Sequence, residues 1–547
     1  MGFDLASISE AVAETIPERT ALAWGDRRWS HADLAERSRR LASFLHEQGL
    51  GCHTERAGLA GHEVGQDLLA IYAYNGNEWI ESMLGSFKAR VAPFNVNYRY
   101  VLDELLYLLR DAGASAIVYQ GTFAPQLAAI RDELPDLRVL IQIDDGSGEA
   151  LLDGAVEYEA ALAAGSPDGP PVTPSPDDLY VLYTGGTTGM PKGVLWRQHD
   201  IFVAAMGGRT AGTWKELGSY DELRAKVGAS GESALLVLPP LMHGAAQWGA
   251  FTAITGGMTI VFPRDVQRMD PVDVLRTIED HGVFLAMGVG DAMARPLVEE
   301  LETGAWDGVS LAVWANGGAA LTAGIKERLL TRLPGLVISD GVGSSETGYQ
   351  MAQVSVKGSV GTGTFTPSPD TVVLDAGLTT VVSPGHAEMG WLGQAGPVPL
   401  GYKGDAEKTA RTFPVIDGRR YSIPGDRALL GEGGDIVLLG RDSVTINSGG
   451  EKIFVEEVEA AIASHPAIRD VVVTGRPSER WGQEVVAVVA LQPGAEPTAE
   501  ELVDHASQSI ARYKLPKAVV FVEGVQRSPS GKADYRWATE QAAAARP

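Results

Sequence analysis

The chain has 547 residues, 45% of them hydrophobic and 21% charged, the proportions of a globular protein with room for several units of ~150 residues. Its formal net charge of −25 argues against nucleic acid as a partner, because non-specific affinity for phosphate backbones depends on clustered Lys and Arg. A single cysteine, Cys52, excludes an internal disulfide, and with neither an apolar run of ~18 residues nor an export leader we expect a cytoplasmic protein without a membrane span.

Helices and strands alternate over the first part of the chain. A helix is expected from Ser30, because Ser30 and Asp33 have the spacing of a capping box and Leu34, Leu41 and Leu45 fall on one face. The elements expected next are a strand at 68–74, a helix at 78–89, an apolar turn at 93–97, a helix at 102–111, a strand at 116–119, a helix at 125–133 and a strand at 139–143. This alternation predicts layered parallel sheets covered by helices.

A loop rich in glycine and hydroxyl groups follows the apolar run at 179–182. Residues 183–194 read Tyr-Thr-Gly-Gly-Thr-Thr-Gly-Met-Pro-Lys-Gly-Val. Glycines let backbone N–H groups close on an anion, and Lys192 adds a mobile positive charge. Pro191 has no N–H, so the loop is not a Walker A motif, and a flexible surface loop is the alternative to a phosphate site. The predicted phosphate ligands are Thr184, Gly185, Gly186, Thr187, Thr188, Gly189 and Lys192.

The rest of the chain divides near residues 440–443. Before that point, the polar stretch at 218–232 is expected to be a surface excursion. After it, the pattern predicts a helix at 455–464, strands at 470–475 and 484–491, a helix at 499–511 and a strand at 518–522. We therefore expect an α/β protein: a large N-terminal body of layered sheets with helices, residues 1–440, and a small mobile α+β C-terminal domain, residues 441–547.

Eight short motifs follow one another in order along nearly the whole chain. They occupy residues 183–194, 239–244, 316–321, 340–348, 424–426, 440–441, 448–452 and 528–532. In this order they resemble the acyl-CoA synthetases of the adenylate-forming superfamily, which also contains luciferases and the adenylation domains of peptide synthetases. The phrases at 95–100, 290–296 and 528–537 are most similar to actinobacterial-type synthetases for fatty acids and steroid side-chain carboxylates.

The resemblance implies a two-step reaction. A carboxylate attacks the α-phosphorus of ATP and expels pyrophosphate, and the thiol of CoA then displaces AMP from the acyl-adenylate. Because anions react with anions, such a site needs electrostatic stabilisation more than covalent help. In the first step Lys532 would bridge the carboxylate and the α-phosphate, while Glu346 would anchor Mg²⁺. An exposed terminal lysine is the alternative for Lys532.

The resemblance also assigns the nucleotide site. Asp426 would accept hydrogen bonds from both ribose hydroxyls, for which a carboxylate has the paired acceptors, and Arg441 would reach ribose or phosphate from the domain junction. A turn with an exposed Asp and a surface salt bridge are the alternatives. The sequence departs from the family pattern at Val342, where many relatives carry an aromatic residue. The remaining predicted nucleotide-binding residues are Asp340, Gly341, Val342 and Ser345.

For the second step the resemblance implies that the small domain turns at Ser443, where relatives usually carry Asp or Lys. The turn would bring Ser448, Gly449, Gly450 and Lys452 to CoA, and a plain turn before a helix is the alternative. His243 is the candidate gate beside the carboxylate, counted as catalytic with Lys532 and Lys192, and a structural histidine is its alternative. The predicted acyl pocket consists of His243, Gln247, Trp248, Asn316, Gly317 and Gly318.

The substrate itself stays open among fatty, aryl and steroid carboxylic acids. No acidic residue lies between Pro239 and Ala250, which disfavours an amino acid. Two other functions stay open as well: transfer of the acyl group to a carrier protein, and a catalytically silent nucleotide-binding protein. A homodimer is a further possibility.

Overall fold

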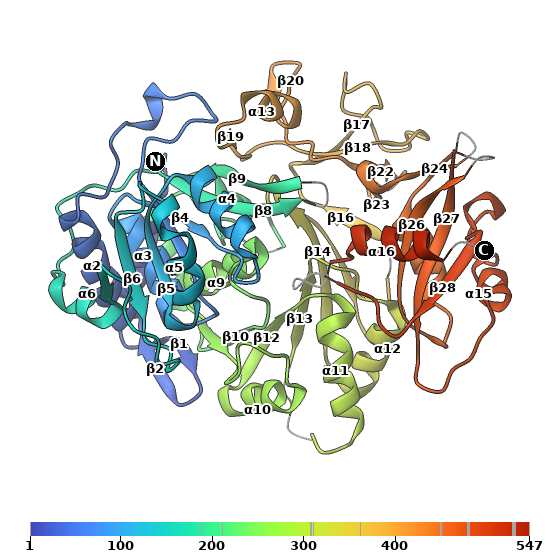
Figure 1. Cartoon of the computed structure of the whole chain (residues 1–547), viewed down its shortest axis with the longest axis horizontal. Helices are drawn as coiled ribbons and strands as arrows, with labels where there is room; N and C mark the ends of the chain where they lie inside the picture. Colours follow the sequence, from blue (N-terminus) through green and yellow to red (C-terminus); the bar gives the residue numbers. More distant parts are fainter. Residues whose placement is uncertain are drawn as a thin grey trace.

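The computed structural model describes residues 2–186, 189–210, 212–306, 309, 311–361, 363–448, 451–478, 482–527 and 532–545. Figure 1 shows a large body built from the first four-fifths of the chain, with the C-terminal segment at the right of the view. The expected α/β class is confirmed, because helices cover several sheets and parallel strands form the centre of two of them. Among these described residues, no helix is long and apolar enough to cross a membrane.

The first sheet is entirely parallel, as the alternation of helices and strands predicts. Alternate residues of its strands face two different cores, so helices cover both faces. Helices α2 and α3 pack on one face, and α4 and α5 pack on the other. The strands, in the order β4-β3-β5-β6-β7, are β3 (Leu68–Tyr72), β4 (Ala92–Asn95), β5 (Ala114–Gln120), β6 (Val139–Ile143) and β7 (Ala155–Glu157). The helices are α2 (His31–Glu47), α3 (Asn77–Lys88), α4 (Leu102–Ala112), α5 (Ala124–Ile130) and α6 (Tyr158–Ala164).

Two local predictions in this region have opposite outcomes. The capping box is confirmed: Ser30 accepts a hydrogen bond from the backbone N–H of Asp33, and Asp33 accepts one from that of Ser30. The expected turn at 93–97 is wrong, because Ala92–Asn95 is the buried strand β4, parallel to β3. Pro93 is tolerated there because β4 lies at the edge of its sheet, where a missing N–H breaks no inner ladder.

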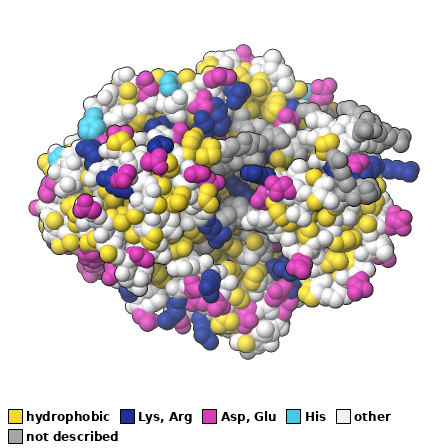
Figure 2. Space-filling model, in the orientation of Figure 1, with side chains coloured by type: hydrophobic (Ala, Val, Ile, Leu, Met, Phe, Trp, Pro, Cys, Tyr) yellow, Lys and Arg dark blue, Asp and Glu magenta, His cyan; other side chains and the backbone are white. Residues whose placement is uncertain are grey.

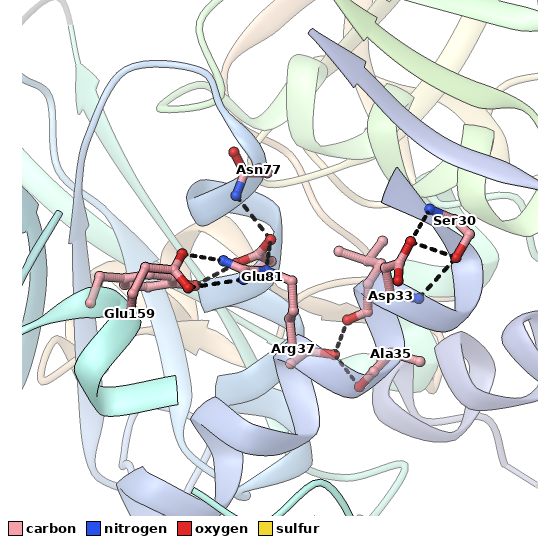
Figure 3. Close-up of polar contacts among 10 residues, drawn as sticks. Ser30, Asp33, Ala35, Arg37, Asn77, Glu81 and Glu159 are labelled. Carbon is pink, nitrogen blue, oxygen red and sulfur yellow. Dashed lines mark hydrogen bonds and ion pairs between the residues drawn. The ribbon is translucent and has the colours of Figure 1, made fainter. Parts of the chain in front are cut away.

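Ion pairs and hydrogen bonds around one buried carboxylate tie α2, α3 and α6 together (Figure 3). The carboxylate of Glu81 in α3 is fully buried and lies 2.8 Å from the Nε atom of Arg37 in α2. Arg37 also pairs with Glu159 in α6, at 2.6 Å. Tyr158 and Asn77 each donate a further hydrogen bond to Glu81, at 3.0 Å. Because every partner of this carboxylate comes from a helix, the network fixes the helices relative to one another.

The second sheet has thirteen strands and is mixed. Its order is β17-β18-β22-β23-β16-β15-β14-β13-β12-β10-β11-β1-β2, and the strands from β14 to β1 in this order are parallel. The parallel strands are β1 (Thr20–Trp24), β10 (Ala234–Val237), β11 (Thr259–Phe262), β12 (Val283–Gly288), β13 (Val313–Gly317) and β14 (Val337–Ser344). The others are β2 (Arg27–Ser30), β15 (Gly348–Ser355), β16 (Thr364–Pro367), β17 (Thr371–Leu374), β18 (Gly390–Gln394), β22 (Asp426–Leu430) and β23 (Ile436–Arg441).

Seven helices accompany this sheet: α1 (Leu5–Thr15), α7 (Gln198–Ala205), α8 (Tyr220–Ala229), α9 (Gly244–Gly256), α10 (Pro271–His281), α11 (Gly290–Glu302) and α12 (Ala323–Arg332). Helix α8 corrects the expectation of a surface excursion at 218–232. Leu223 and Val227 are buried in the same core as residues of α1, although most of the stretch is polar. Two apolar residues one turn apart are enough to attach a short helix.

The phosphate-loop candidate is a β-hairpin. Strands β8 (Leu179–Gly186) and β9 (Gly189–Arg197) pair antiparallel, so that Thr184 lies opposite Lys192. The short strand β19 (Gly401–Tyr402) continues the sheet on the other side of β9, and helix α13 (Ala406–Thr412) follows it. A separate pair, β20 (Val415–Ile416) and β21 (Arg419–Arg420), comes next.

The C-terminal segment has its own sheet and its own core. The sheet consists of β24 (Ile446–Ser448), β25 (Glu451–Ile453), β26 (Ile468–Ser478), β27 (Gly482–Leu491) and β28 (Ala518–Val522). Helices α14 (Val455–Ala463), α15 (Ala499–Ala506) and α16 (Tyr535–Ala544) complete it. The predicted strand at 518–522 is confirmed, whereas the helix predicted at 499–511 ends at Ala506. The division at residues 440 and 441 stays a prediction.

Candidate active site

The predicted site residues come from separate elements of the chain. Figure 2 shows Lys and Arg side chains around a hollow near the middle of the view. The hairpin β8–β9, the ends of β13 and β14, the strand pair β22–β23 and the chain before α16 each contribute predicted residues. The assignments of these residues to ligands stay predictions.

Asp426 and Arg441 form a cross-strand pair. They are the first residue of β22 and the last residue of β23, and the antiparallel register places them opposite each other. The Nε atom of Arg441 lies 3.4 Å from the Oδ1 atom of Asp426. Burial raises the pKa of the Asp426 carboxyl, and the charge of Arg441 opposes that rise. The pair thus keeps a largely buried carboxylate beside a guanidinium that is 40% exposed.

Glu346 lies in the turn between β14 and β15, within electrostatic range of this pair. Its Oε1 atom accepts a hydrogen bond of 2.8 Å from the hydroxyl of Tyr402 in β19. Its backbone carbonyl accepts another from Ser422, at 2.6 Å. Burial, together with the charge of Glu346, raises the pKa of Tyr402, so this tyrosine remains a donor. The second carboxylate oxygen of Glu346 forms no hydrogen bond or ion pair within the described ranges.

Lys532 lies in the chain just before α16 and keeps access to solvent. The surrounding protein and the charge of Arg441 lower its pKa, while the carboxylates of Glu346 and Asp426 act in the opposite direction. The structure therefore brings Lys532 near three residues that the sequence places far from it. Residues 528–531 of the same motif lie outside the described residues.

The predicted phosphate lysine lies in an ion pair. The Nζ atom of Lys192 is 3.0 Å from the Oδ2 atom of Asp405, the residue that caps α13. Asp405 is a site residue that sequence reasoning missed, and the one signal available was that of an N-cap before a short helix. Thr187 and Thr188 lie outside the described residues, and the structure places Thr184, Gly185, Gly186 and Gly189 along the strands of the hairpin.

The predicted nucleotide-binding residues Asp340, Gly341 and Val342 lie on β14, next to acyl-pocket candidates on β13. In the register of β13 and β14, Asn316 lies beside Asp340 and Gly317 beside Gly341. Asn316 donates to the Oδ1 atom of Asp340 at 3.0 Å, and Lys326 of α12 lies 2.6 Å from the Oδ2 atom. Asn316 also accepts from the backbone N–H of Gly290, at 2.7 Å. The amide of Asn316, predicted to line the acyl pocket, therefore holds the backbone and Asp340 in place.

Three other predicted residues lie near or just beyond the ends of β13 and β14. Gly318, predicted for the acyl pocket, follows β13 with φ of 79°, a conformation that favours glycine. Val342 is partly buried against the small core around Met351, so it offers an apolar surface in place of an aromatic ring. The backbone carbonyl of Ser345 accepts a hydrogen bond of 2.8 Å from the indole N–H of Trp196.

The other acyl-pocket candidates lie at the start of α9. His243 is the N-cap residue of this helix, and its Nε2 atom is buried without a hydrogen-bond partner in the described structure. Burial, followed by the charges of Lys532 and Arg99, lowers the pKa of His243 to about 4. His243 is therefore neutral at physiological pH. Arg99 joins the site through this coupling and is another residue that the sequence did not single out.

Gln247 and Trp248 have different surroundings. Gln247 is buried, accepts from the hydroxyl of Tyr180 at 2.6 Å and donates to the carbonyl of Leu241 at 2.8 Å, so both ends of its amide are used. The buried indole N–H of Trp248 has no partner in the parts of the chain described. A Cβ atom added to Gly244 would lie 3.2 Å from the Trp248 ring and 2.6 Å from Leu182. This helix start leaves no room for a larger residue at 244.

The residues predicted to turn the domain and to bind CoA lie beyond β23. Ser443 follows Arg441 in a short 3₁₀ helix (Asp442–Val444), and Ser448 ends β24. Lys452 lies in β25, opposite Asn447, and Gly449 and Gly450 lie outside the described residues.

The sequence matches two family models. The model described as AMP-binding enzyme matches residues 9–397, and that described as AMP-binding enzyme C-terminal domain matches residues 457–532. The chain is 63% identical over 540 residues to the medium-chain acyl-CoA ligase Mig of Mycobacterium avium, covering 99% of this chain and 98% of that protein. It is 40% identical over 555 residues to the 3-oxocholest-4-en-26-oate–CoA ligase of Rhodococcus rhodochrous, covering 99% and 96%.

Solved structures share the fold. The anthranilate CoA ligase AuaEII, crystallised with anthranoyl-AMP, superposes with a TM-score of 0.81 over 99% of this chain and 98% of that one. A Mycobacterium tuberculosis fatty acyl CoA synthetase gives a TM-score of 0.71 over 100% and 99%. Their sequence identities of 19% and 21% make this a likeness of fold alone.

Proposed function

The chain belongs to the AMP-binding enzyme family, and we propose that it is an ATP-dependent ligase that joins a carboxylic acid to coenzyme A. In the first step the carboxylate attacks the α-phosphorus of ATP, an acyl-phosphate bond forms, and pyrophosphate leaves. In the second step the sulfur of CoA attacks the acyl carbon, the thiol proton is lost, and AMP leaves. Both leaving groups are anions, so the site has to stabilise negative charge.

The grouping of Lys532 with Asp426, Arg441 and Glu346 is the observation that carries this proposal. The charges of Arg441 and Glu346 act on the pKa values of both Asp426 and Lys532, although the four residues come from separate places in the chain. A protein that only bound a nucleotide would have no need for a lysine from the C-terminal segment beside this pair. The 63% identity to a named acyl-CoA ligase over almost the whole of both chains supports the same conclusion.

Each residue has a role in the first step. The carboxylate of Asp426 holds the ribose hydroxyls, and Arg441 holds Asp426 and reaches toward the phosphates. Lys192, at the hairpin β8–β9, holds the β- and γ-phosphates. Lys532 bridges the attacking carboxylate and the α-phosphate, and the surrounding protein and the charge of Arg441 lower its pKa. A cation positioned beside a developing negative charge stabilises that charge.

The carboxylate of Glu346 fits a magnesium ion brought in with ATP. The described residues hold no group of three or more His, Cys, Asp or Glu side chains that could bind a metal by themselves. Mg²⁺ is commonly held by one or two carboxylates together with substrate phosphates, and the Oε2 atom of Glu346 is available for that. When bound, the ion would neutralise phosphate charge. Tyr402 would orient the carboxylate through its hydrogen bond to the Oε1 atom.

The second step requires the C-terminal segment to turn. Lys532 would leave the site, and Ser448, Gly449, Gly450 and Lys452 would meet CoA. The turn would take place at Ser443, next to Arg441 at the end of β23. Such domain movements are common where one site serves two half-reactions.

We propose a medium-chain fatty acid as the preferred substrate. The relative with 63% identity carries that specificity in its name, while a 40% identical relative is named for a steroid acid. The stretch between Pro239 and Ala250 holds no acidic residue that could meet an α-ammonium group. The partly buried Trp248 and the neutral His243 at the start of α9 fit an apolar acyl chain better than a charged one.

One experiment tests the reaction and the substrate class together. The purified chain is incubated with ATP, Mg²⁺ and CoA, and with fatty acids of graded length, a steroid side-chain acid, aryl acids and amino acids in turn. AMP and acyl-CoA are then quantified by mass spectrometry. We expect equal amounts of AMP and acyl-CoA, most with medium-chain acids. Acyl transfer to a carrier protein but not to CoA, or no AMP with any acid, would refute the proposed function.

A further inference from the structure

The ion pair of Lys192 and Asp405 joins the phosphate-loop candidate to a different part of the chain. The two residues are 213 positions apart, yet the Nζ and Oδ2 atoms lie 3.0 Å from each other. Both side chains are partly exposed, Lys192 at 33% and Asp405 at 26%. A pair with this much access to water is weak and can exchange one partner for another.

We propose that Asp405 forms an ion pair with Lys192 while no nucleotide is bound, and that the polyphosphate of ATP must replace Asp405 as the partner of Lys192. Asp405 is then a positioning residue that weakens the binding of ATP and of pyrophosphate and so favours the release of pyrophosphate. The identity of the anion rests on the proposed function, since that function makes a polyphosphate the ligand of Lys192.

The structure fixes Asp405 more firmly than it fixes Lys192. The second oxygen of Asp405, Oδ1, accepts from the backbone N–H of Lys408 at 2.9 Å and so caps α13. The chain before it is bound to the strand that carries Lys192: Tyr402 lies opposite Val194, and the N–H of Lys403 donates to Gly193 at 2.8 Å. Lysine has a flexible four-carbon stem, so Lys192 can move to a phosphate while Asp405 stays.

The charge of Asp405 is secure at neutral pH. The hydrogen bond from the Lys408 N–H, and after it the one from Lys192, lower the pKa of the Asp405 carboxyl. The ammonium group of Lys408 lies 4.0 Å from the centre of the Tyr402 ring, and Tyr402 in turn donates to Glu346. Lys408 thus links Asp405 to Tyr402, and Tyr402 links it to Glu346. The fixed negative charge of Asp405 opposes another anion at Lys192.

The substitution Asp405→Asn separates the two roles of this side chain. Asparagine caps a helix about as well as aspartate does, but it carries no charge. Pyrophosphate binding to the full chain is measured by calorimetry, and KM for ATP and kcat are measured by AMP release. We expect the dissociation constant of pyrophosphate and KM for ATP each to fall about two- to fivefold, as loss of a partly exposed pair implies, while kcat does not rise.

Two controls accompany this variant. Asp270→Asn changes another N-cap aspartate, at α10, and is expected to leave both constants unchanged. In a Lys192→Ala background, Asp405→Asn is expected to lose its effect, because the residue on which Asp405 acts is missing. Asp405→Ala, which removes the cap as well, is expected to lower the thermal unfolding midpoint more than Asp405→Asn does.

The outcomes separate this inference from the proposed function. Unchanged pyrophosphate binding in Asp405→Asn would overturn the inference, and so would an effect that persists without Lys192. Pyrophosphate binding needs no turnover, so tighter binding in Asp405→Asn supports the inference even if no acid yields AMP. In that case the proposed ligase function is refuted, while the inference about Asp405 and Lys192 stands.

Discussion

The Nε atom of Arg441 lies 3.4 Å from the Oδ1 atom of Asp426, across two neighbouring antiparallel strands. Each residue stands at the end of its strand, where the register of β22 and β23 brings them together. The chain after Arg441 leads within a few residues into the C-terminal sheet. A movement of the C-terminal segment would therefore act on Arg441, which pairs with Asp426, the candidate ligand of the ribose hydroxyls.

Replacing Asp426 by asparagine is expected to raise KM for ATP about tenfold to a hundredfold. Hydrogen bonds to a charged group contribute about 1.5–3 kcal/mol, and the neutral amide loses that contribution. KM for CoA should change little, and Asp435→Asn, at the exposed residue just before β23, is the matched control. A normal KM for ATP in Asp426→Asn would remove this residue from the nucleotide site.

The same carboxyl sets a pH dependence. Because burial raises the pKa of Asp426 above the usual value, the carboxylate form is lost at a higher pH than for an exposed aspartate. Affinity for ATP should thus decrease as pH falls through that raised pKa. Titrating the binding of an ATP analogue against pH, in the wild type and in Asp426→Asn, checks this. If affinity decreased at acid pH with the same midpoint and the same size in both proteins, the prediction would be wrong.

Lys532→Ala is expected to abolish formation of the acyl-adenylate while largely sparing thioester formation from acyl-adenylate supplied from outside. The reason is that Lys532 meets the reacting phosphate only in the first half-reaction. Pyrophosphate exchange measures the first step, and acyl-CoA formation from the adenylate measures the second. Lys517→Ala, an exposed lysine of the same segment, serves as the control. Normal exchange in Lys532→Ala would end its assignment.

The lowered pKa of Lys532 gives a second test of the same residue. If the charged form is needed, the kcat/KM of adenylation falls as pH rises through the pKa of Lys532, which lies below the usual lysine value of 10.5. Lys532→Arg should shift this alkaline limb upward, because a guanidinium stays protonated in that range. An alkaline limb that does not move would show that another group is responsible.

His243→Phe is expected to retain adenylation, because a side chain whose pKa is lowered to about 4 is neutral in the wild type as well. Between about pH 5 and 8 the two proteins should therefore show the same pH profile, although free histidine titrates there. His243→Ala should instead shift preference toward bulkier acids. A profile that loses an acid limb in His243→Phe would assign His243 to proton transfer.

The network around Glu81 predicts a large effect on stability without a direct effect on the site. Arg37→Met leaves the fully buried carboxylate of Glu81 without its cation, and breaking such a pair costs about 3–5 kcal/mol. The exposed pair of Arg224 with Glu14 is the comparison, and Arg224→Met should cost less than about 1 kcal/mol. Urea unfolding of the two variants measures the difference, and similar midpoints would refute the argument.

Local signals in the sequence correctly predicted helices and strands that have a cap or a clear apolar pattern. The helix after Ser30 follows from a capping box and an apolar stripe, and the structure contains both. The strand at 518–522 follows from an apolar run between polar segments. These predictions succeed because caps and periodicity act within a few residues of the chain. The expected turn at 93–97 failed because burial against β3, a long-range contact, decided that segment.

The sequence by itself also determined the chemistry of the chain: the ordered motifs indicate the family and name Lys192, Glu346, Asp426, Arg441 and Lys532. Only the tertiary structure decided how these residues meet. The sequence does not show that Asp405 holds Lys192, since the pairing of β19 with β9 brings together residues 213 positions apart. Strand register depends on which faces the whole sheet buries, so no local spacing encodes it. That is why the partner of the phosphate lysine could be found only in the fold.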